Sequence, residues 1–352
     1  MAIHSLSFPP GQGSRAASGK SSKDVLIFMI SGNPGLIDYY EPFLSALRTL
    51  LDSSPASKET QFHIYGQDLA GFNDDDHEPF SDANPPRDVA YQDEAGNPQK
   101  HGQPFDEVIL IGHSVGTYLI LQLFHEQLRS PERAPHLRLQ TGILLFPTIE
   151  HIRHSPSGQR LELLRSAALL ERHAHRLAAG FLRLWPGVAL RWVLTTLLGH
   201  PPAAADVTAR WLQSRDGVWQ ALHMGLDEMR VIGEDQWDEE LWEIEREGEA
   251  AAQRGSDASG STVVASEEEE NSSGAAAANG DKLPPKFFFF FGKDDHWVAN
   301  HFRDAFIERR QKQAERTRLM VDEGNLPHAF CIHHSEVVAD KVASWINELY
   351  AP

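Results

Sequence analysis

The sequence predicts an α/β protein with a mostly parallel central sheet. Short β-branched and aromatic runs, of the length of buried strands, alternate with longer stretches in which apolar residues recur at helical spacing. Three of these runs are Val25–Ile30, Val108–Ile111 and Phe287–Phe291. Such alternation is typical of strand–helix–strand units, whose parallel strands are buried on both faces and therefore apolar throughout.

The second run leads into a motif that carries chemistry. It is followed at once by Gly112-His113-Ser114-Val115-Gly116 and then by a helical pattern. A Gly-x-Ser-x-Gly segment between a strand and a helix is the nucleophile elbow of the α/β-hydrolase fold. Gly112 and Gly116 would let strand and helix approach closely around Ser114. The N–H of Val115, at the helix N-terminus, would face a developing oxyanion.

Composition limits the partners and the compartment. The formal net charge of the 352 residues is −18, but residues 245–281 alone account for −7 of it. The remainder is ordinarily acidic, which argues against nucleic acid as a partner. A single cysteine, Cys331, excludes an internal disulfide and is typical of a reducing compartment.

Segment composition predicts one domain with two insertions. Residues 1–23 are rich in Ser, Gly and Pro and lack an apolar core, which indicates a disordered leader and not a signal peptide. Residues 24–350 would form the α/β-hydrolase domain, with a helical cap at about 155–235. Residues 246–284 are rich in Ala, Gly, Ser and Glu, so we expect a disordered acidic insertion there.

The loop after the first strand is a candidate second half of an oxyanion hole. Gly32-Asn33-Pro34-Gly35 stands one strand–helix unit ahead of the elbow, where this fold places that loop. The N–H of Asn33 is the expected donor, because Pro34 has none. A plain Gly-Pro turn is the alternative interpretation. A helix over 43–51 and a strand over 62–65 are predicted next.

Residues 73–105 are polar and are predicted to form a long loop around about one helical turn. Asp74-Asp75-Asp76-His77 suggests a metal site, but the segment lacks the glycine turn and distant glutamate of a calcium loop. A solvated acidic loop is the favoured interpretation. No metal and no cofactor is predicted anywhere in the chain.

The most apolar stretch is 181–199, inside the predicted cap. Arg183, Arg191 and the break at Pro186-Gly187 argue against a membrane span, which needs about 20 mostly apolar residues. Two interpretations stay open: a cap helix packed on the core, or an amphipathic segment lying in a lipid interface. The candidate lipid-contacting side chains are Phe181, Trp185, Leu190, Trp192 and Leu194.

Strands are predicted at 142–146, 287–291 and 319–321, and a closing amphipathic helix at 337–349. In this fold the catalytic acid and histidine follow the nucleophile along the chain in that order. Asp295 stands three residues after Gly292, in the loop after the predicted strand 287–291, with Asp294 as the reserve candidate. His328 alone lies in the loop that directly follows the last strand, because His333 and His334 already stand at the start of the final helix. Ser114, Asp295 and His328 are thus the predicted triad.

Three segments together resemble the lipid droplet-associated hydrolase family. They are the block from Gly32 to Phe43, the elbow at 112–116, and Leu145-Phe146-Pro147-Thr148-Ile149. The resemblance implies an α/β-hydrolase with the same triad that hydrolyses neutral lipid or sterol esters. It also implies peripheral attachment to lipid droplets or membranes, with cytosolic and endoplasmic reticulum pools. This sequence departs from the commonest acid loop in carrying His296 where proline is frequent.

Two other functions are consistent with the sequence. One is a droplet-binding protein whose triad is weak or inactive. The other is a soluble hydrolase of small esters or thioesters without contact to a lipid surface. The oligomeric state and the acyl and alcohol specificity are left open by the sequence.

Overall fold

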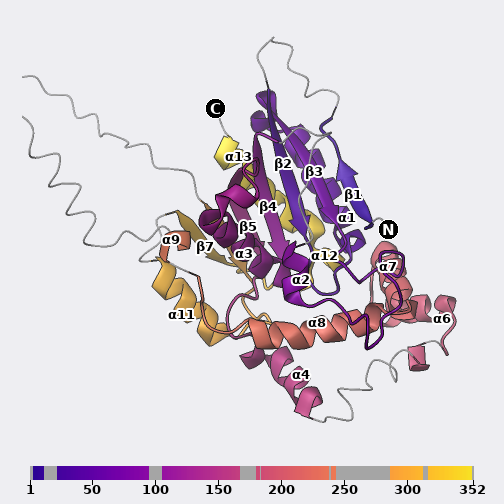
Figure 1. The fold of residues 1–352 in the computed structure, drawn as a ribbon. Coiled ribbons are helices and arrows are strands. Elements are labelled where there is room, and N and C mark those ends of the chain that lie inside the picture. Colours follow the sequence, from indigo (N-terminus) through magenta and orange to yellow (C-terminus); the bar gives the residue numbers. More distant parts are fainter. Residues whose placement is uncertain are drawn as a thin grey trace, which may run out of the picture.

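A single sheet lies at the centre of the computed structural model (Figure 1). The structure describes residues 3–11, 22–94, 105–166, 180–182, 184–237, 239–242, 286–311 and 316–350. Within them, seven strands follow the order β1-β3-β2-β4-β5-β6-β7. The strands are β1 Ser5–Phe8, β2 Lys23–Ile30, β3 Thr60–Gln67, β4 Glu107–His113, β5 Leu139–Leu145, β6 Phe287–Phe291 and β7 Thr317–Val321.

All strand pairs are parallel except β1 with β3. The carboxyl ends of β2 to β7 therefore share one edge of the sheet. Loops that follow these strands meet at that edge, which is where ligands bind in open α/β sheets. The expected α/β-hydrolase fold is confirmed by this topology together with the strand–turn–helix at residues 107–129.

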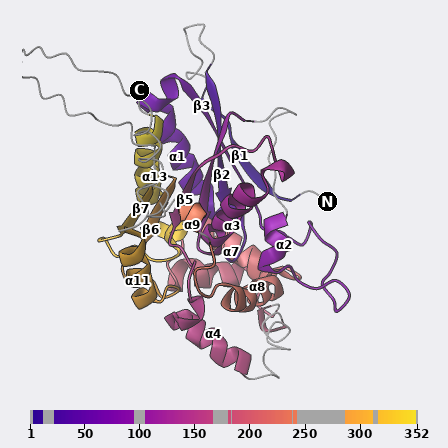
Figure 2. The same ribbon diagram turned by 60° about the vertical axis from the view of Figure 1, so that its left-hand side comes forward.

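Helices cover both faces of the sheet (Figures 1 and 2). One face carries α1 Glu41–Asp52 and α13 Ser335–Tyr350. The other carries α2 Val89–Glu94, α3 Val115–Arg129, α9 Glu239–Trp242 and α11 Asn300–Gln311. Shorter elements are the 3₁₀ turns Ile37–Tyr40, Pro55–Lys58, Pro131–Arg133 and Ile152–His154, the π-helical Val193–Leu197, and α12 Phe330–His333.

Four helices lie beyond the carboxyl edge of the sheet. They are α4 Pro156–Ser166, α6 Gly187–Trp192, α7 Pro202–Gln213 and α8 Gly217–Val231. In Figure 1 they occupy the lower part of the molecule, and α8 runs beneath the sheet from α11 toward α7. Since α8 contacts α2, α4 and α7, it is the central helix of this group, which we term the cap.

The five consecutive phenylalanines of β6 are buried on both faces of the sheet. Phe288 and Phe290 pack against Trp345 of α13, with ring centroids 5.1 and 6.0 Å apart. Phe289 packs against Phe306 of α11 on the opposite face. An interior parallel strand covered by helices on both sides needs apolar residues at every position, and this need accounts for the run.

One part of the predicted leader is ordered, so the prediction of disorder for 1–23 is wrong at 5–8. There β1 pairs with β3 in antiparallel register, with Ser5 opposite Gln67. The adjacent His4 Nε2 lies 2.7 Å from Asp38 Oδ1. Backbone pairing and this contact hold a segment whose own side chains are only partly buried. The predicted acidic insertion at 246–284 lies outside the described residues.

None of the helices in the described part of the chain combines the length and the apolar character that crossing a membrane requires.

Candidate active site

Ser114 sits at the turn between β4 and α3. Its φ of 54° and ψ of −125° are sparsely populated for a non-glycine residue, as the nucleophile elbow requires. Both flanking glycines are at close approaches: a Cβ on Gly112 would lie 2.6 Å from the Gly116 carbonyl oxygen, and a Cβ on Gly116 would collide with the carbonyl oxygen of Ile30. The tight crossing of strand and helix thus leaves room for hydrogen only.

The other two predicted triad residues meet Ser114 at the same edge of the sheet. His328 Nε2 lies 2.9 Å from Ser114 Oγ, and His328 Nδ1 lies 2.6 Å from Asp295 Oδ2. The carboxylate of Asp295 accepts a hydrogen bond from the Nδ1–H of His328. Nε2 then carries no proton and can take the hydroxyl proton of Ser114. The remaining oxygen of Asp295 accepts the N–H of Trp297 at 2.8 Å. The reserve candidate Asp294 is instead exposed.

The three side chains are shielded from water, with 8% of Ser114, 7% of His328 and 3% of Asp295 exposed. Burial alone raises the pKa of Asp295, but the attraction of His328 and the hydrogen bonds from His328 and Trp297 outweigh it, so that the pKa lies below its usual range. Asp295 is therefore an anion at neutral pH, able to orient the imidazole and stabilise its charged form.

The loop after β2 lies against the nucleophile, as predicted. A Cβ on Gly32 would be 2.9 Å from the Cβ of Ser114. The N–H of Gly32 donates to the Tyr40 hydroxyl at 3.0 Å, so it is already used. Among the described residues, no group accepts a hydrogen bond from the N–H of Asn33 or of Val115, the two predicted oxyanion donors. Their role in binding an oxyanion stays a prediction.

The side chain of Asn33 joins this loop to the cap. Its Nδ2 donates to the carbonyl oxygen of Ala221 at 2.9 Å and to Glu228 Oε1 at 3.1 Å, both on α8. Glu228 is 4% exposed, and burial raises its pKa to about 8 although the bond from Asn33 lowers it. Sequence reasoning missed Glu228, because an isolated glutamate on a helix has the signature of a solvated face.

Two of the five predicted lipid-contacting residues are placed differently from the prediction. Leu190 and Leu194 are 7% and 3% exposed and form a small core with Ala205 and Ala209 of α7. The prediction is wrong for these two because residues four apart on a helix share one face, and this face packs on α7.

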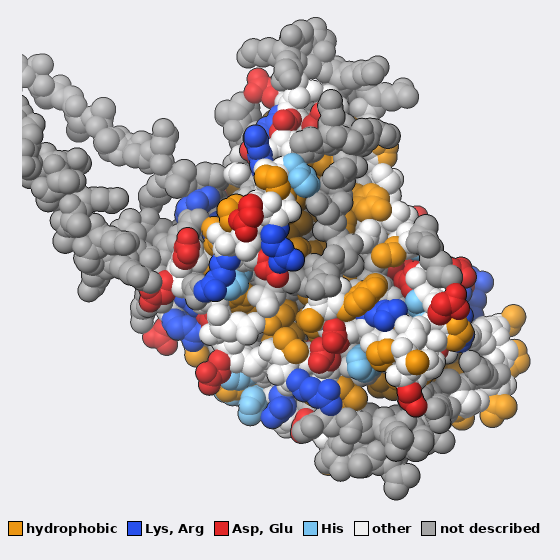
Figure 3. Space-filling view, in the orientation of Figure 1, with side chains coloured by type: hydrophobic (Ala, Val, Ile, Leu, Met, Phe, Trp, Pro, Cys, Tyr) orange, Lys and Arg blue, Asp and Glu red, His pale blue; other side chains and the backbone are white. Residues whose placement is uncertain are grey.

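Phe181, Trp185 and Trp192 are exposed, as predicted. We define the apolar surface as these three with four neighbours, and Figure 3 shows orange side chains over this end of the cap. The four neighbours, each at least 60% exposed, are Leu184, Val188, Leu197 and Leu198. Arg191 is paired with Asp206 at 2.8 Å at the margin, whereas Arg183 lies outside the described residues.

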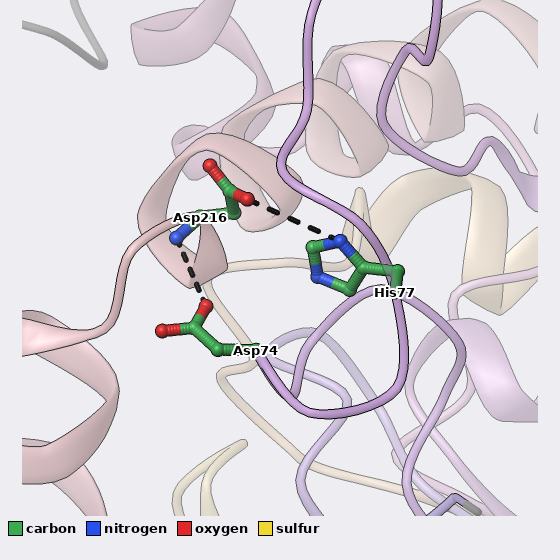
Figure 4. A group of neighbouring side chains, drawn as sticks. All are labelled: Asp74, His77 and Asp216. Carbon is green, nitrogen blue, oxygen red and sulfur yellow. Dashed lines mark hydrogen bonds and ion pairs between the residues drawn. The ribbon is translucent and has the colours of Figure 1, made fainter. Parts of the chain in front are cut away.

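The acidic loop that suggested a metal docks on the cap (Figure 4). Asp74, His77 and Asp216 bring their polar atoms within 4.8 Å of one another. However, the carboxylate of Asp74 accepts the N–H groups of Arg215 and Asp216, and Asp216 Oδ2 accepts Arg215 Nε at 2.8 Å. The guanidinium already supplies the positive charge. The favoured interpretation, a solvated acidic loop, is wrong at His77, which is buried and stacks on Phe80.

A serine at a strained elbow, an acid after β6 and a histidine after β7 define the α/β-hydrolase class. A crystal structure of a membrane phospholipase A, described as a novel bacterial virulence factor, has the same fold. Its TM-score is 0.53 at 14% identity, over 100% of this chain and 87% of that one.

The family model for lipid-droplet associated hydrolase matches residues 23–331, and the chain belongs to this family. It is 34% identical over 157 residues to the lipid droplet-associated hydrolase of Mus musculus, covering 38% of this chain and 41% of that protein. It is 30% identical over 145 residues to that of Drosophila melanogaster, with the same coverage of 38% and 41%. The matched region thus spans about two fifths of these curated relatives.

Proposed function

We propose that the protein is a serine ester hydrolase that acts on neutral lipid or sterol esters at the surface of lipid droplets. The observation that carries the catalytic part is the continuous hydrogen-bonded series from Ser114 through His328 to Asp295 at the elbow. The family's name supports a hydrolase and association with droplets.

The geometry supports a two-step reaction through an acyl-enzyme. His328 Nε2 accepts the Ser114 proton as Oγ attacks the ester carbonyl, and it then donates that proton to the departing alcohol. Asp295 stabilises the transient imidazolium. The N–H groups of Asn33 and Val115 are the proposed donors to the oxyanion. A water molecule, deprotonated by His328, then cleaves the acyl-enzyme and restores Ser114.

The decisive experiment compares the purified protein with Ser114→Ala and with the exposed-site control Ser53→Ala. We expect hydrolysis of a panel of p-nitrophenyl, triacylglycerol and sterol esters by the wild type and control, and loss in Ser114→Ala. A fluorophosphonate probe should label the wild type and Ser53→Ala, but not Ser114→Ala. No turnover and no labelling of wild type would favour a droplet-binding protein without catalysis. Turnover of small soluble esters alone would favour a soluble esterase.

The droplet part of the proposal rests on the apolar surface. Its seven side chains project from one end of the cap, while Leu190 and Leu194 fix the helix beneath them. Each large apolar side chain that leaves water contributes about 1.5 to 3 kcal/mol before ordering costs, so several together suffice for reversible attachment. The apolar surface can lie in a phospholipid monolayer without a membrane-spanning helix. The cap also adjoins the loop that contacts Ser114.

Flotation with phosphatidylcholine-coated triolein droplets tests this surface. The variant Leu184→Ser/Val188→Ser/Trp192→Ser/Leu197→Ser should remain in the aqueous fraction, whereas wild type floats. The control Val337→Ser removes an exposed apolar side chain of α13, outside the cap, and it should float. Hydrolysis of a soluble short-chain ester by the quadruple variant should persist. If that variant floats like wild type, attachment lies elsewhere.

A further inference from the structure

A buried chain of hydrogen bonds runs behind the triad and uses residues that the reaction itself does not. The Gly32 N–H lies 3.0 Å from the Tyr40 hydroxyl oxygen, which lies 2.6 Å from His113 Nδ1. His113 Nε2 in turn lies 2.8 Å from the carbonyl oxygen of His328. This series of hydrogen bonds therefore joins three segments: the loop after β2, the residue before the nucleophile, and the loop that carries the catalytic histidine.

The chemistry of the groups determines which one donates and which one accepts in each of these hydrogen bonds. The carbonyl of His328 can only accept, so His113 carries its proton on Nε2. His113 Nδ1 is then an acceptor and receives the Tyr40 proton, and the Tyr40 oxygen accepts the Gly32 N–H. Burial, followed by the nearby His328, lowers the pKa of His113 to about 3, so the ring stays neutral with one proton at physiological pH.

Aromatic rings enclose His113 and exclude competing partners. Phe330 and Phe146 pack edge-on against it, with ring centroids 5.2 and 6.1 Å away. His113 is 5% exposed and Tyr40 3%. In such a dry environment a hydrogen bond is strong, and its loss leaves a buried polar group without a partner.

We propose that His113, held by Tyr40, is a positioning residue for the catalytic histidine. Its Nε2–H fixes the main chain of His328, while its own backbone precedes Ser114 and Tyr40 fixes Gly32. The three loops are thus held as one rigid unit, and the proton transfer between Ser114 and His328 keeps its geometry. The His113 imidazole lies 5.0 Å from that of His328, centroid to centroid, but the hydrogen bonds of the His328 ring go to Asp295 and Ser114 and not to His113. This inference rests on the proposed ester hydrolysis.

The proposal predicts an effect on turnover and not on substrate binding. A displacement of about 1 Å at a reacting group can lower the rate by about 100-fold. We expect His113→Leu, which keeps the apolar packing but removes both bonds, to lower kcat at least tenfold for a soluble short-chain ester. KM should stay within twofold. Tyr40→Phe removes the hydroxyl that donates to His113 and accepts from Gly32, but it leaves the bond from His113 to the carbonyl of His328, so it should lower kcat by a smaller factor of at least three.

The conservative variant His113→Gln separates a donor from a packing role. A glutamine amide places an N–H close to the position of Nε2 and a carbonyl oxygen toward Tyr40, so it should recover most of kcat. Leu47→Ala in the α1–α13 core, remote from the network, is the control for lost stability. It should lower the melting temperature without changing kcat at 25 °C.

Two failures are distinguishable. If wild type hydrolyses no ester and Ser114 takes no fluorophosphonate, the proposed function fails and this inference fails with it. If wild type is active and His113→Leu keeps kcat within twofold, the positioning role is wrong and ester hydrolysis stands. Should His113→Leu not fold, the other two variants decide: a fully active Tyr40→Phe, or a folded His113→Gln with less than a tenth of wild-type kcat, overturns the proposal.

Discussion

Replacing Glu228 by glutamine should stabilise the protein at pH 8 and leave its stability at pH 4.5 nearly unchanged. Glu228 lies on α8 with its carboxyl buried against Asn33. Burial raises its pKa in the folded chain to about 8, from an ordinary value of 4.5. A glutamine has the same shape, can accept the same bond from Asn33 and never ionises.

The sign follows from proton linkage. Between pH 4.5 and about 8 the folded chain keeps a proton on Glu228 that the unfolded chain has lost. The free energy of unfolding must therefore fall as pH rises, by about 1.4 kcal/mol per pH unit for this one group. Summed over the interval, the wild type loses on the order of 4 kcal/mol that Glu228→Gln retains.

Urea unfolding followed by tryptophan fluorescence at pH 4.5, 6, 7 and 8 measures the difference. The gap between variant and wild type should widen steadily with pH, whereas the exposed neighbour Glu234→Gln should run parallel to wild type throughout. Equal pH dependence of Glu228→Gln and wild type would show that Glu228 titrates normally in the folded chain. In that case α8 does not bury an uncharged carboxyl against the loop after β2.

Three further predictions concern packing. Gly116→Ala places a methyl against the carbonyl oxygens of Ile30 and Ser31. We expect the free energy of unfolding in urea to fall by about 1 to 3 kcal/mol, and fluorophosphonate labelling to slow greatly. Normal labelling would contradict the close approach. Leu190→Ala should cost about 2 to 5 kcal/mol, whereas the exposed Leu197→Ala should stay within about 0.5; equal losses would place Leu190 at the surface. Deleting 250–280 should shift the melting temperature little, and a large drop would show that the segment packs.

The order of chemical groups along the chain predicted which three side chains lie together at the carboxyl edge of the sheet. Ser114, Asp295 and His328 each follow a strand that is readable as an apolar run, and parallel strands bring their ends to one edge. The fold thus requires the three to meet, which explains why residues up to 214 positions apart could be paired without a structure.

The features that could not be predicted depend on which way a side chain points, or on contacts between residues far apart in the sequence. Leu190 and Leu194 look like any apolar pair at helical spacing, and only the position of α7 decides which face of the helix is buried. Tyr40 and His113 are 73 positions apart, and no pattern links them. The four residues of β1 are too few and too polar to indicate a strand without their partner β3.

The short strand β1 has a consequence for how the protein behaves in solution. Without it, β3 would be the outermost strand and would present a row of unpaired N–H and C=O groups. Such a row is a template onto which a second polypeptide can add, and it leads to association or aggregation. The register of β1 covers Ile64 to Gln67. A shortened protein that starts after residue 10 should therefore self-associate through β3, while the carboxyl edge that holds Ser114, Asp295 and His328 stays folded.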